Sequence, residues 1–255
     1  MTDHLYIRWI ELPEPVPGDC YLAQLPAVKH LAEKKIEFHK PVTFFVGENG
    51  SGKSTLIEAL AVALGFNPEG GTKNFCFSTE NTHSELHRFL RVARGVIRPG
   101  DGFFLRAESF YNVATNIDEM DRDPSGIGPP VIGSYGDVSL HKQSHDESFL
   151  ALAENRFGGK GVYILDEPEA ALSPRGIIRL LQRMDELVRD YSQFIIATHS
   201  PMLLCFPGAE VYQISEKGID SVRFQDTDHY RTTVRFLQNP ESAMEDILGC
   251  GGERE

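Results

Sequence analysis

One eight-residue segment constrains the fold of this chain more than any other. Residues 47–54 read Gly-Glu-Asn-Gly-Ser-Gly-Lys-Ser, which fits the pattern G-x-x-x-x-G-K-S/T. The apolar run Val42–Val46 before it predicts a strand buried on both faces, and Lys53–Leu64 after it predicts a helix that Gly65 ends. Because glycines let successive backbone N–H groups turn inward, residues 47–54 are predicted to form a phosphate-binding loop, called the phosphate loop below.

Short apolar runs alternate with longer helical patterns along the rest of the chain, which predicts an α/β fold. The runs expected to form further strands are Leu5–Ile10, Cys20–Leu25, Gly102–Ala107, Val162–Leu165, Phe194–Ala197, Glu210–Ile214 and Ser221–Phe224. Further helices are expected over Asn81–Arg94, after Ser173-Pro174 and over Tyr230–Leu237. Clustered prolines and glycines predict a long loop over Asp118–Asp137.

Charge and composition narrow the classes of function. The 255 residues carry a formal net charge of −12, so the surface as a whole should repel polyanions. DNA contact is therefore expected only through a local basic patch such as Arg88–Arg106. The chain start lacks a signal-peptide pattern, no apolar run reaches the roughly 18 residues of a membrane span, and the cysteines form no C-x-x-C pair. We expect a cytoplasmic protein without membrane insertion.

Two carboxylates follow the predicted strand Val162–Leu165. Asp166 and Glu167 stand at its carboxyl end, where a metal ligand and a base are needed beside a phosphate loop. We expect Asp166 and the Ser54 hydroxyl on the metal side, Glu167 as the general base that polarises water, and Lys53 on the β- and γ-phosphates of a nucleotide. An Asp-Glu pair alone would favour a solvated turn, but its position downstream of the phosphate loop favours function.

Four segments resemble the nucleotide motifs of one family. Residues 47–54, Leu165–Pro168, Ala170–Pro174 and Ala197–Pro201 resemble the Walker A, Walker B, D-loop and His-switch of the ABC-type ATPases, and they occur in the family's order. The Thr-His-Ser-Pro form of the last segment is common in soluble members: chromosome-maintenance, RecF-like and OLD-like ATPases, and small predicted bacterial AAA-family ATPases.

The resemblance covers about residues 40–206. It implies a P-loop NTPase fold of the ABC head type, with a mostly parallel central sheet, an N-terminal antiparallel β portion and a small helical insertion. A single domain over residues 1–255, with its insertion near residues 80–157, is expected. The resemblance also implies that His199 contacts the γ-phosphate and acts in catalysis beside Glu167. The residues implied in ATP binding are Gly47, Glu48, Asn49, Gly50, Ser51, Gly52, Lys53, Ser54, Thr55 and Ser144.

Two family positions are altered in this sequence. Glu108 stands at a strand end where the family has the glutamine of the Q-loop, and its carboxylate is a candidate Mg²⁺ ligand. Residues 143–148 resemble the glycine-rich signature that covers the nucleotide of the opposite subunit, but both glycine positions are filled, one of them by Asp146. Ser144 and Glu147 also stand at capping-box spacing, so the same letters fit a helix cap. Both interpretations stay open.

These observations favour Mg²⁺-dependent ATP binding and hydrolysis by a soluble ABC-type ATPase that forms a homodimer around ATP and drives a protein partner. Three alternatives stay open: the nucleotide-binding subunit of a membrane transporter, a nucleotide switch with little hydrolysis, and a small-molecule P-loop kinase. The unusual Asp146 and Glu108 favour the switch, and the intact Asp166-Glu167 pair opposes it. The kinase alternative is opposed because the sequence shows no arginine-rich segment that could form the lid of such an enzyme.

Overall fold

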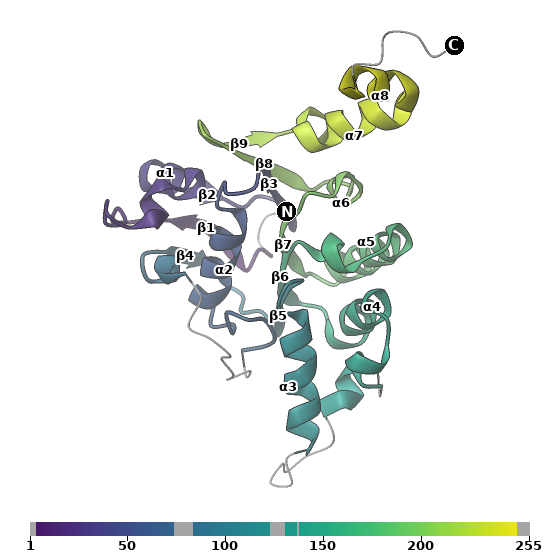
Figure 1. Cartoon of the computed structure of the whole chain (residues 1–255). Helices are drawn as coiled ribbons and strands as arrows, with labels where there is room; N and C mark the ends of the chain where they lie inside the picture. The colour runs from purple at the N-terminus through teal and green to yellow at the C-terminus, as the bar shows by residue number, and fades with distance from the viewer. Residues whose placement is uncertain (1–3, 74–83, 123–130, 137, 249–255) are drawn as a thin grey trace.

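The computed structural model describes residues 4–73, 84–122, 131–136 and 138–248 (Figure 1). Its central sheet has the strand order β5-β6-β7-β3-β8-β9, in which β9 pairs antiparallel with β8 and the other pairs are parallel. These strands are β3 (Val42–Gly47), β5 (Asp101–Arg106), β6 (Gly161–Asp166), β7 (Gln193–Ala197), β8 (Glu210–Ser215) and β9 (Gly218–Val222). The predicted α/β fold with a mostly parallel sheet is confirmed.

A second, antiparallel sheet has the order β2-β1-β4. Its strands are β1 (Ile7–Glu11), β2 (Ile36–Glu37) and β4 (Arg91–Arg94). The predicted N-terminal antiparallel portion is therefore confirmed, and β1 pairs with β2 and β4.

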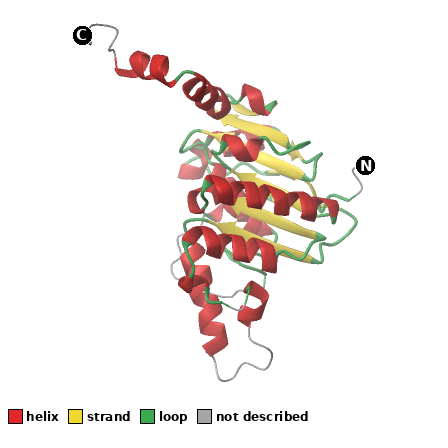
Figure 2. Ribbon diagram, turned by 90° about the vertical axis from the view of Figure 1, so that its right-hand side faces the viewer, coloured by secondary structure: helices red, strands yellow, loops and turns green. Residues whose placement is uncertain are grey.

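Helices cover both faces of the central sheet (Figures 1 and 2). The described helices are α1 (Pro26–Glu33), α2 (Lys53–Ala63), α3 (Phe110–Arg122), α4 (His145–Arg156), α5 (Pro174–Arg189), α6 (Pro201–Leu204), α7 (Asp228–Gln238) and α8 (Pro240–Leu248). Of these, α7 and α8 extend beyond the β9 end of the sheet and cover neither face (Figure 1). Because strand side chains alternate between faces, Phe44 packs in the core under α3, α4 and α5, whereas Phe45 packs in the core with α1, α2 and β1. In the described part of the chain, none of these helices is both long enough and apolar enough to span a bilayer.

Three sequence predictions of secondary structure were wrong. Tyr21–Gln24, expected within a strand, is a 3₁₀ helix with a single buried residue, and Pro26 then begins α1. The described part of the helix expected over Asn81–Arg94 contains a 3₁₀ helix, Glu85–Arg88, followed by β4, and its first three residues lie outside the described part. Antiparallel pairing with the edge of β1 decides the conformation of β4, so tertiary contact overrides the helical spacing.

The third error concerns the long loop expected over Asp118–Asp137. The helix α3 continues to Arg122, and Val131–Tyr135 forms a 3₁₀ helix. Residues 123–130 and 137 lie outside the described part. Burial of Val113 and Ile117 against the core explains why helix α3 forms despite the breakers that follow it. The single domain over 1–255 and its insertion near 80–157 stay predictions.

The side chain of Gln193 in β7 fixes the N-terminal segment to the central sheet. Its Oε1 accepts hydrogen bonds from the N–H groups of Tyr6 and Ile7, each at 2.9 Å, and its Nε2 donates to the Ile7 carbonyl oxygen at 3.0 Å. Gln193 is 1% exposed, so all three bonds are shielded from water. Strand β1 therefore depends on one buried side chain for its attachment here.

Replacing Gln193 with leucine should lower the free energy of unfolding by about 2–4 kcal/mol, because leucine leaves two buried N–H groups without acceptors. The matched control is Gln182→Leu on an exposed position of α5, which should change stability by less than about 0.5 kcal/mol. Urea unfolding followed by circular dichroism measures both. Equal midpoints for the two variants would contradict the role of Gln193.

Candidate functional site

The phosphate loop turns sharply between β3 and α2, and its glycines permit the path. Gly52 has a left-handed backbone with φ of 94°, which side-chain-bearing residues rarely adopt. A Cβ atom on Gly47 would lie 2.5 Å from the carbonyl oxygen of Ile214 in β8. Because that neighbour is backbone and cannot move aside cheaply, only glycine allows the loop to pass so close to β8.

Lys53 begins α2 and folds its side chain back over the phosphate loop. Its Nζ donates to the carbonyl oxygens of Gly47 at 2.8 Å and Glu48 at 3.0 Å, and the residue is 4% exposed. Burial lowers the pKa of Lys53, and nearby carboxylates, including Asp166, counteract this shift. The loop thus holds a largely buried ammonium group next to backbone N–H groups, which suits an anionic ligand.

The other predicted loop residues differ in exposure. The exposed ones are Glu48, Asn49 and Gly50. Ser51 is buried, and its Oγ has no hydrogen-bond partner among the described residues. Ser54 and Thr55 are half-buried in the first turn of α2. Contact of these side chains with a nucleotide stays a prediction.

Three neighbouring parallel strands end beside the phosphate loop. β6, β7 and β3 are adjacent in the sheet, so the residues that follow their carboxyl ends meet at one edge. Backbone hydrogen bonds continue past the strands: the N–H of Glu167 donates to Ala197 at 2.9 Å, and that of Thr198 donates to Phe45 at 3.1 Å. The structure therefore brings the phosphate loop, the Asp166-Glu167 pair and the segment of His199 together.

Asp166 is 4% exposed, and its Oδ1 has no hydrogen-bond partner among the described residues. Burial raises the pKa of Asp166 to about 7, and the carboxylates of Glu167 and Glu108 add to the rise. The guanidinium group of Arg106 and a hydrogen bond from Ser54 oppose it. Ser54 and Asp166 thus place two oxygen atoms, of the kind that Mg²⁺ prefers, beside the phosphate loop.

Arg106 lies at the end of β5 and was predicted only as part of the basic patch Arg88–Arg106. Its Nη1 donates to the buried Glu58 of α2 at 2.7 Å, and its Nε lies 3.4 Å from Asp166 Oδ2. Its Nη2 lies 3.5 Å from Glu108, whose side chain is 82% exposed. Only the parallel register, which pairs Arg106 with Asp166, could have revealed this role. The role of Glu108 as a metal ligand stays a prediction.

Glu167 has a left-handed backbone with φ of 51°, which is uncommon for a residue other than glycine. Its side chain is 37% exposed, and Oε1 lies 3.4 Å from Nε2 of His199. Backbone strain of this kind is concentrated at functional sites. The predicted base and the predicted γ-phosphate contact are therefore adjacent, at a strained position beside the strand end.

His199 also contacts a second histidine that the sequence did not indicate. Its Nδ1 lies 2.8 Å from Nε2 of His229, which α7 supplies. Burial lowers the pKa of both histidines, and the Lys53 ammonium lowers both further. Both rings are therefore neutral near pH 7, so one N–H donates to the other ring and fixes its tautomer.

The backbone of His199 is fixed by a half-buried carboxylate, that of Glu169. Its N–H donates to Glu169 Oε1, and burial raises the pKa of Glu169. Glu169 follows Glu167 by two residues, so the segment after β6 holds the segment after β7 in place. A sequence of alternating acidic residues carries no signal that would distinguish this positioning role.

The predicted signature residue Ser144 caps α4. Its Oγ accepts from the N–H of Glu147 at 3.3 Å, and Glu147 accepts from the N–H of Ser144 at 3.1 Å. The capping-box interpretation is confirmed, whereas contact of Ser144 with a nucleotide stays a prediction. The Asp146 carboxylate accepts a hydrogen bond from Ser173, at the start of α5. Within one chain, the charge of Asp146 is thus directed toward the D-loop segment.

Most arginines of the predicted basic patch Arg88–Arg106 are neutralised. The ion pairs are Arg88 with Glu85, Arg91 with Glu11 and Arg106 with Glu58. Arg94 and Arg98 are in no ion pair with a residue that the structure describes. The segment therefore offers a long polyanion fewer free positive charges than its sequence suggests.

Family models match two separate parts of the chain. One described as an AAA domain matches residues 27–97, which include the phosphate loop. Another, described as an AAA domain, putative AbiEii toxin, Type IV TA system, matches residues 148–204, which include the carboxylate pair and the His-switch segment.

The chain is also similar to several curated proteins and to a solved structure. An energy-coupling factor transporter ATP-binding protein from Methanospirillum hungatei is 27% identical over 68% of this chain and 45% of its own length. The DNA replication and repair protein RecF from Clostridium kluyveri is 22% identical over 86% of this chain and 64% of its own. The chain thus spans less than half of the first relative and under two thirds of the second. The structure of cbiO1 from Clostridium perfringens, part of the ABC transporter complex cbiONQ, shares the fold, with a TM-score of 0.55 and 15% identity over 96% of this chain and 99% of that one.

The burial of Asp166 should make the stability of the ligand-free chain depend on pH. Its pKa is about 7 in the fold, so the stability that its protonated form contributes is complete below about pH 4 and is lost as the pH rises through about 7. Asp166→Asn should remove this loss and raise the free energy of unfolding at pH 8 by on the order of 4 kcal/mol, with little change at pH 4.

Urea unfolding between pH 4 and pH 8 measures the effect of Asp166→Asn. Asp185→Asn, at a half-exposed carboxylate of α5, should keep the wild-type pH profile. Parallel stability profiles for the wild type and Asp166→Asn would contradict a buried, proton-retaining carboxyl group.

Proposed function

We propose that this chain is an ABC-type ATPase domain, as its fold and the order of its motifs support, and that it binds ATP with Mg²⁺ and hydrolyses the β–γ anhydride bond. One observation carries the proposal: Lys53, Asp166 and the Glu167–His199 pair converge at the carboxyl ends of three adjacent parallel strands. This arrangement places a cation for phosphates, a metal ligand and a base around one point.

The phosphate loop would bind the triphosphate. Lys53 Nζ now donates to the carbonyl oxygens of Gly47 and Glu48. Phosphate oxygens are stronger acceptors for an ammonium group than neutral carbonyls, so Lys53 would turn toward the β- and γ-phosphates when ATP enters. The N-terminus of α2 adds its unpaired N–H groups to the same site.

The residues beside the loop fit Mg²⁺. Ser54 and Asp166 supply oxygen donors, and the free Oδ1 of Asp166 is buried where a ligand would need it. A bound Mg²⁺ would offset negative charge on the β- and γ-phosphates. Arg106 lies 3.4 Å from Asp166 and partly neutralises it in the ligand-free chain.

Glu167 would accept the proton of the attacking water. His199 Nε2, 3.4 Å from the Glu167 carboxylate, faces the same space and would hold the γ-phosphate or the water by a hydrogen bond. His229 would act as a positioning residue, because its bond to Nδ1 fixes which nitrogen of His199 carries the proton.

A second copy of the chain would complete the site. Ser144 caps α4, whose N-terminal N–H groups form an anion site that a nucleotide on another subunit could reach. We propose an ATP-dependent homodimer in the cytoplasm that acts on a protein partner. The transporter-subunit alternative is supported by the similarity to an energy-coupling factor transporter ATP-binding protein and by the fold shared with cbiO1, and copurification with a membrane protein would favour it.

Glu167→Gln should keep ATP affinity within about threefold, lower turnover by at least about 100-fold, and accumulate an ATP-bound dimer, because glutamine cannot accept the proton. Glu216→Gln, at an exposed carboxylate between β8 and β9, is the control and should hydrolyse ATP at the wild-type rate. Phosphate release and light scattering measure the two effects. Turnover of Glu167→Gln at the control rate would remove Glu167 from the mechanism.

His229→Phe should lower kcat about tenfold while KM changes little. Phenylalanine keeps an aromatic ring at this position but cannot hydrogen bond to Nδ1 of His199, so it no longer fixes the tautomer of His199. His229→Gln, which can still hydrogen bond to Nδ1, should recover much of the rate. Arg235→Gln, further along α7, loses only an exposed ion pair with Asp246 and serves as the control. Steady-state kinetics that show equal kcat for His229→Phe and the control would reject the positioning role.

A further inference from the structure

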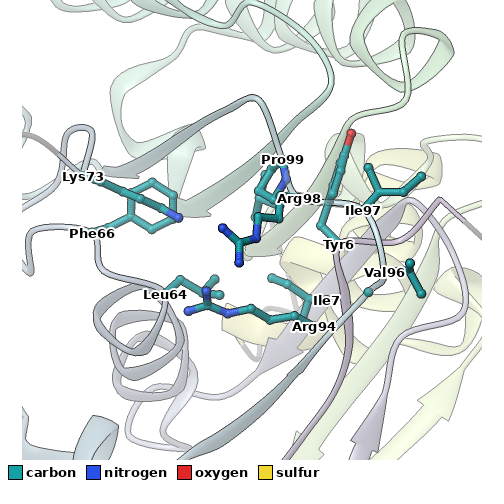
Figure 3. Close-up of a pocket in the computed structure, with 12 residues that line it drawn as sticks. Tyr6, Ile7, Leu64, Phe66, Lys73, Arg94, Val96, Ile97, Arg98 and Pro99 are labelled. Carbon is teal, nitrogen blue, oxygen red and sulfur yellow. The ribbon is translucent and has the colours of Figure 1, made fainter.

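A cavity of about 510 Å³, called the rear pocket, lies at the opposite end of the sheet from the phosphate loop (Figure 3). Leu64 and Phe66 line it just after the end of α2, and Val162 lines it near the start of β6. The phosphate loop and Asp166 lie at the other ends of these two elements. Because the 11 residues of α2 span roughly 16 Å, the rear pocket is separate from the nucleotide site.

Three cationic side chains surround the rear pocket: Lys73, Arg94 and Arg98. Figure 3 shows their charged ends turned toward the same space, beside Phe66 and Leu64. No acidic side chain is among the described residues that line the pocket. None of the three cations forms an ion pair with a described residue, although every other arginine from Arg88 to Arg106 does.

The positive charges of the rear pocket repel one another. Lys73 has a lowered pKa, first because of burial and then because of Arg94. Its ammonium lies 5.3 Å from the centre of the Phe66 ring. In a chain of net charge −12, carboxylates are abundant, yet none of the described ones relieves this repulsion. An anionic ligand would relieve it.

The pocket also has apolar surface. Ile7, Leu64, Phe66 and Val162 contribute apolar side chains, and its volume falls in the roughly 300–1,000 Å³ range of small-molecule sites. A ligand with a planar apolar part and a phosphate group could therefore use both halves of the pocket. The ion pairs of Arg88 and Arg91 leave little free charge for a long polyanion outside it.

We propose that the rear pocket binds the phosphate group of a nucleotide, either free or at the 5′ end of a nucleic-acid strand. Arg94, Arg98 and Lys73 are its phosphate ligands, and the base packs on the apolar surface beside Phe66. This site goes beyond the proposed hydrolysis of ATP, because it shares no side chain with the phosphate loop.

The test uses the full chain with Lys53→Ala, which weakens nucleotide binding at the phosphate loop. Calorimetry compares three probes: AMP, a 5′-phosphorylated tetranucleotide and the same tetranucleotide with a 5′ hydroxyl. Saturable binding is expected for AMP, for the phosphorylated strand or for both, and at least tenfold weaker binding for the hydroxyl strand. The two phosphorylated probes distinguish a free nucleotide from a strand end.

Two double variants separate specific binding from general charge. Arg94→Gln with Arg98→Gln should weaken binding of the phosphorylated probe at least tenfold, whereas Arg88→Gln with Arg91→Gln removes the same charge outside the pocket and should weaken it less than threefold. In the chain with Lys53 intact, the double variant Arg94→Gln with Arg98→Gln should remove the weaker nucleotide site, at the rear pocket, and leave the stronger site at the phosphate loop unchanged. All four arginines are exposed, so thermal unfolding midpoints should stay near the wild type.

Three results would overturn the proposal. They are no saturable binding of any probe at millimolar concentration, equal loss of affinity in both double variants, and binding to anionic vesicles in place of the nucleotide probes. The last result would assign the arginines and the exposed Val96 and Ile97 to a lipid surface.

Discussion

The parallel alignment of β6, β7 and β3 is the constraint on which the rest of this structure depends. Each strand is buried along its whole length, so its apolar residues fix it between two layers of helices. Parallel strands end at the same edge, and the polar residues that follow them must therefore meet there. The site is a consequence of that alignment: Lys53 lies more than a hundred residues before Asp166 and His199 in the sequence, yet the three meet at one edge of the sheet.

Charges gathered at this edge are costly without a ligand, and the ligand-free chain reduces the cost with its own groups. Lys53 donates to loop carbonyls, and Arg106 lies between Glu58 and Asp166. Asp166 keeps a raised pKa because these partners do not fully replace water. ATP and Mg²⁺, in the proposed function, would supply better partners to the same groups, so binding would relieve the electrostatic cost of folding.

Elements outside the four motifs contribute functional side chains at both ends of the central sheet. At the carboxyl edge, α7 brings His229 against His199, so a hydrogen bond joins this helix to the proposed nucleotide site. At the opposite end, the segment after α2 and the loop after β4 form the cationic rear pocket. The proposed nucleotide site and the rear pocket lie at opposite ends of α2 and β6.

Local patterns in the sequence predicted the strands of the central sheet and the glycine-rich loop that follows β3. The apolar run before Gly47, the glycines and the helix from Lys53 are local patterns, and the order of motifs carries the resemblance to the ABC-type ATPases. The sequence misassigned β4, because hydrogen bonding to β1 decides its conformation. Arg106, Glu169 and His229 could not be predicted, since their roles depend on strand register and on where α7 packs. Tertiary structure alone decides such contacts, because burial and hydrogen bonding act between groups that are close in space, however distant in sequence.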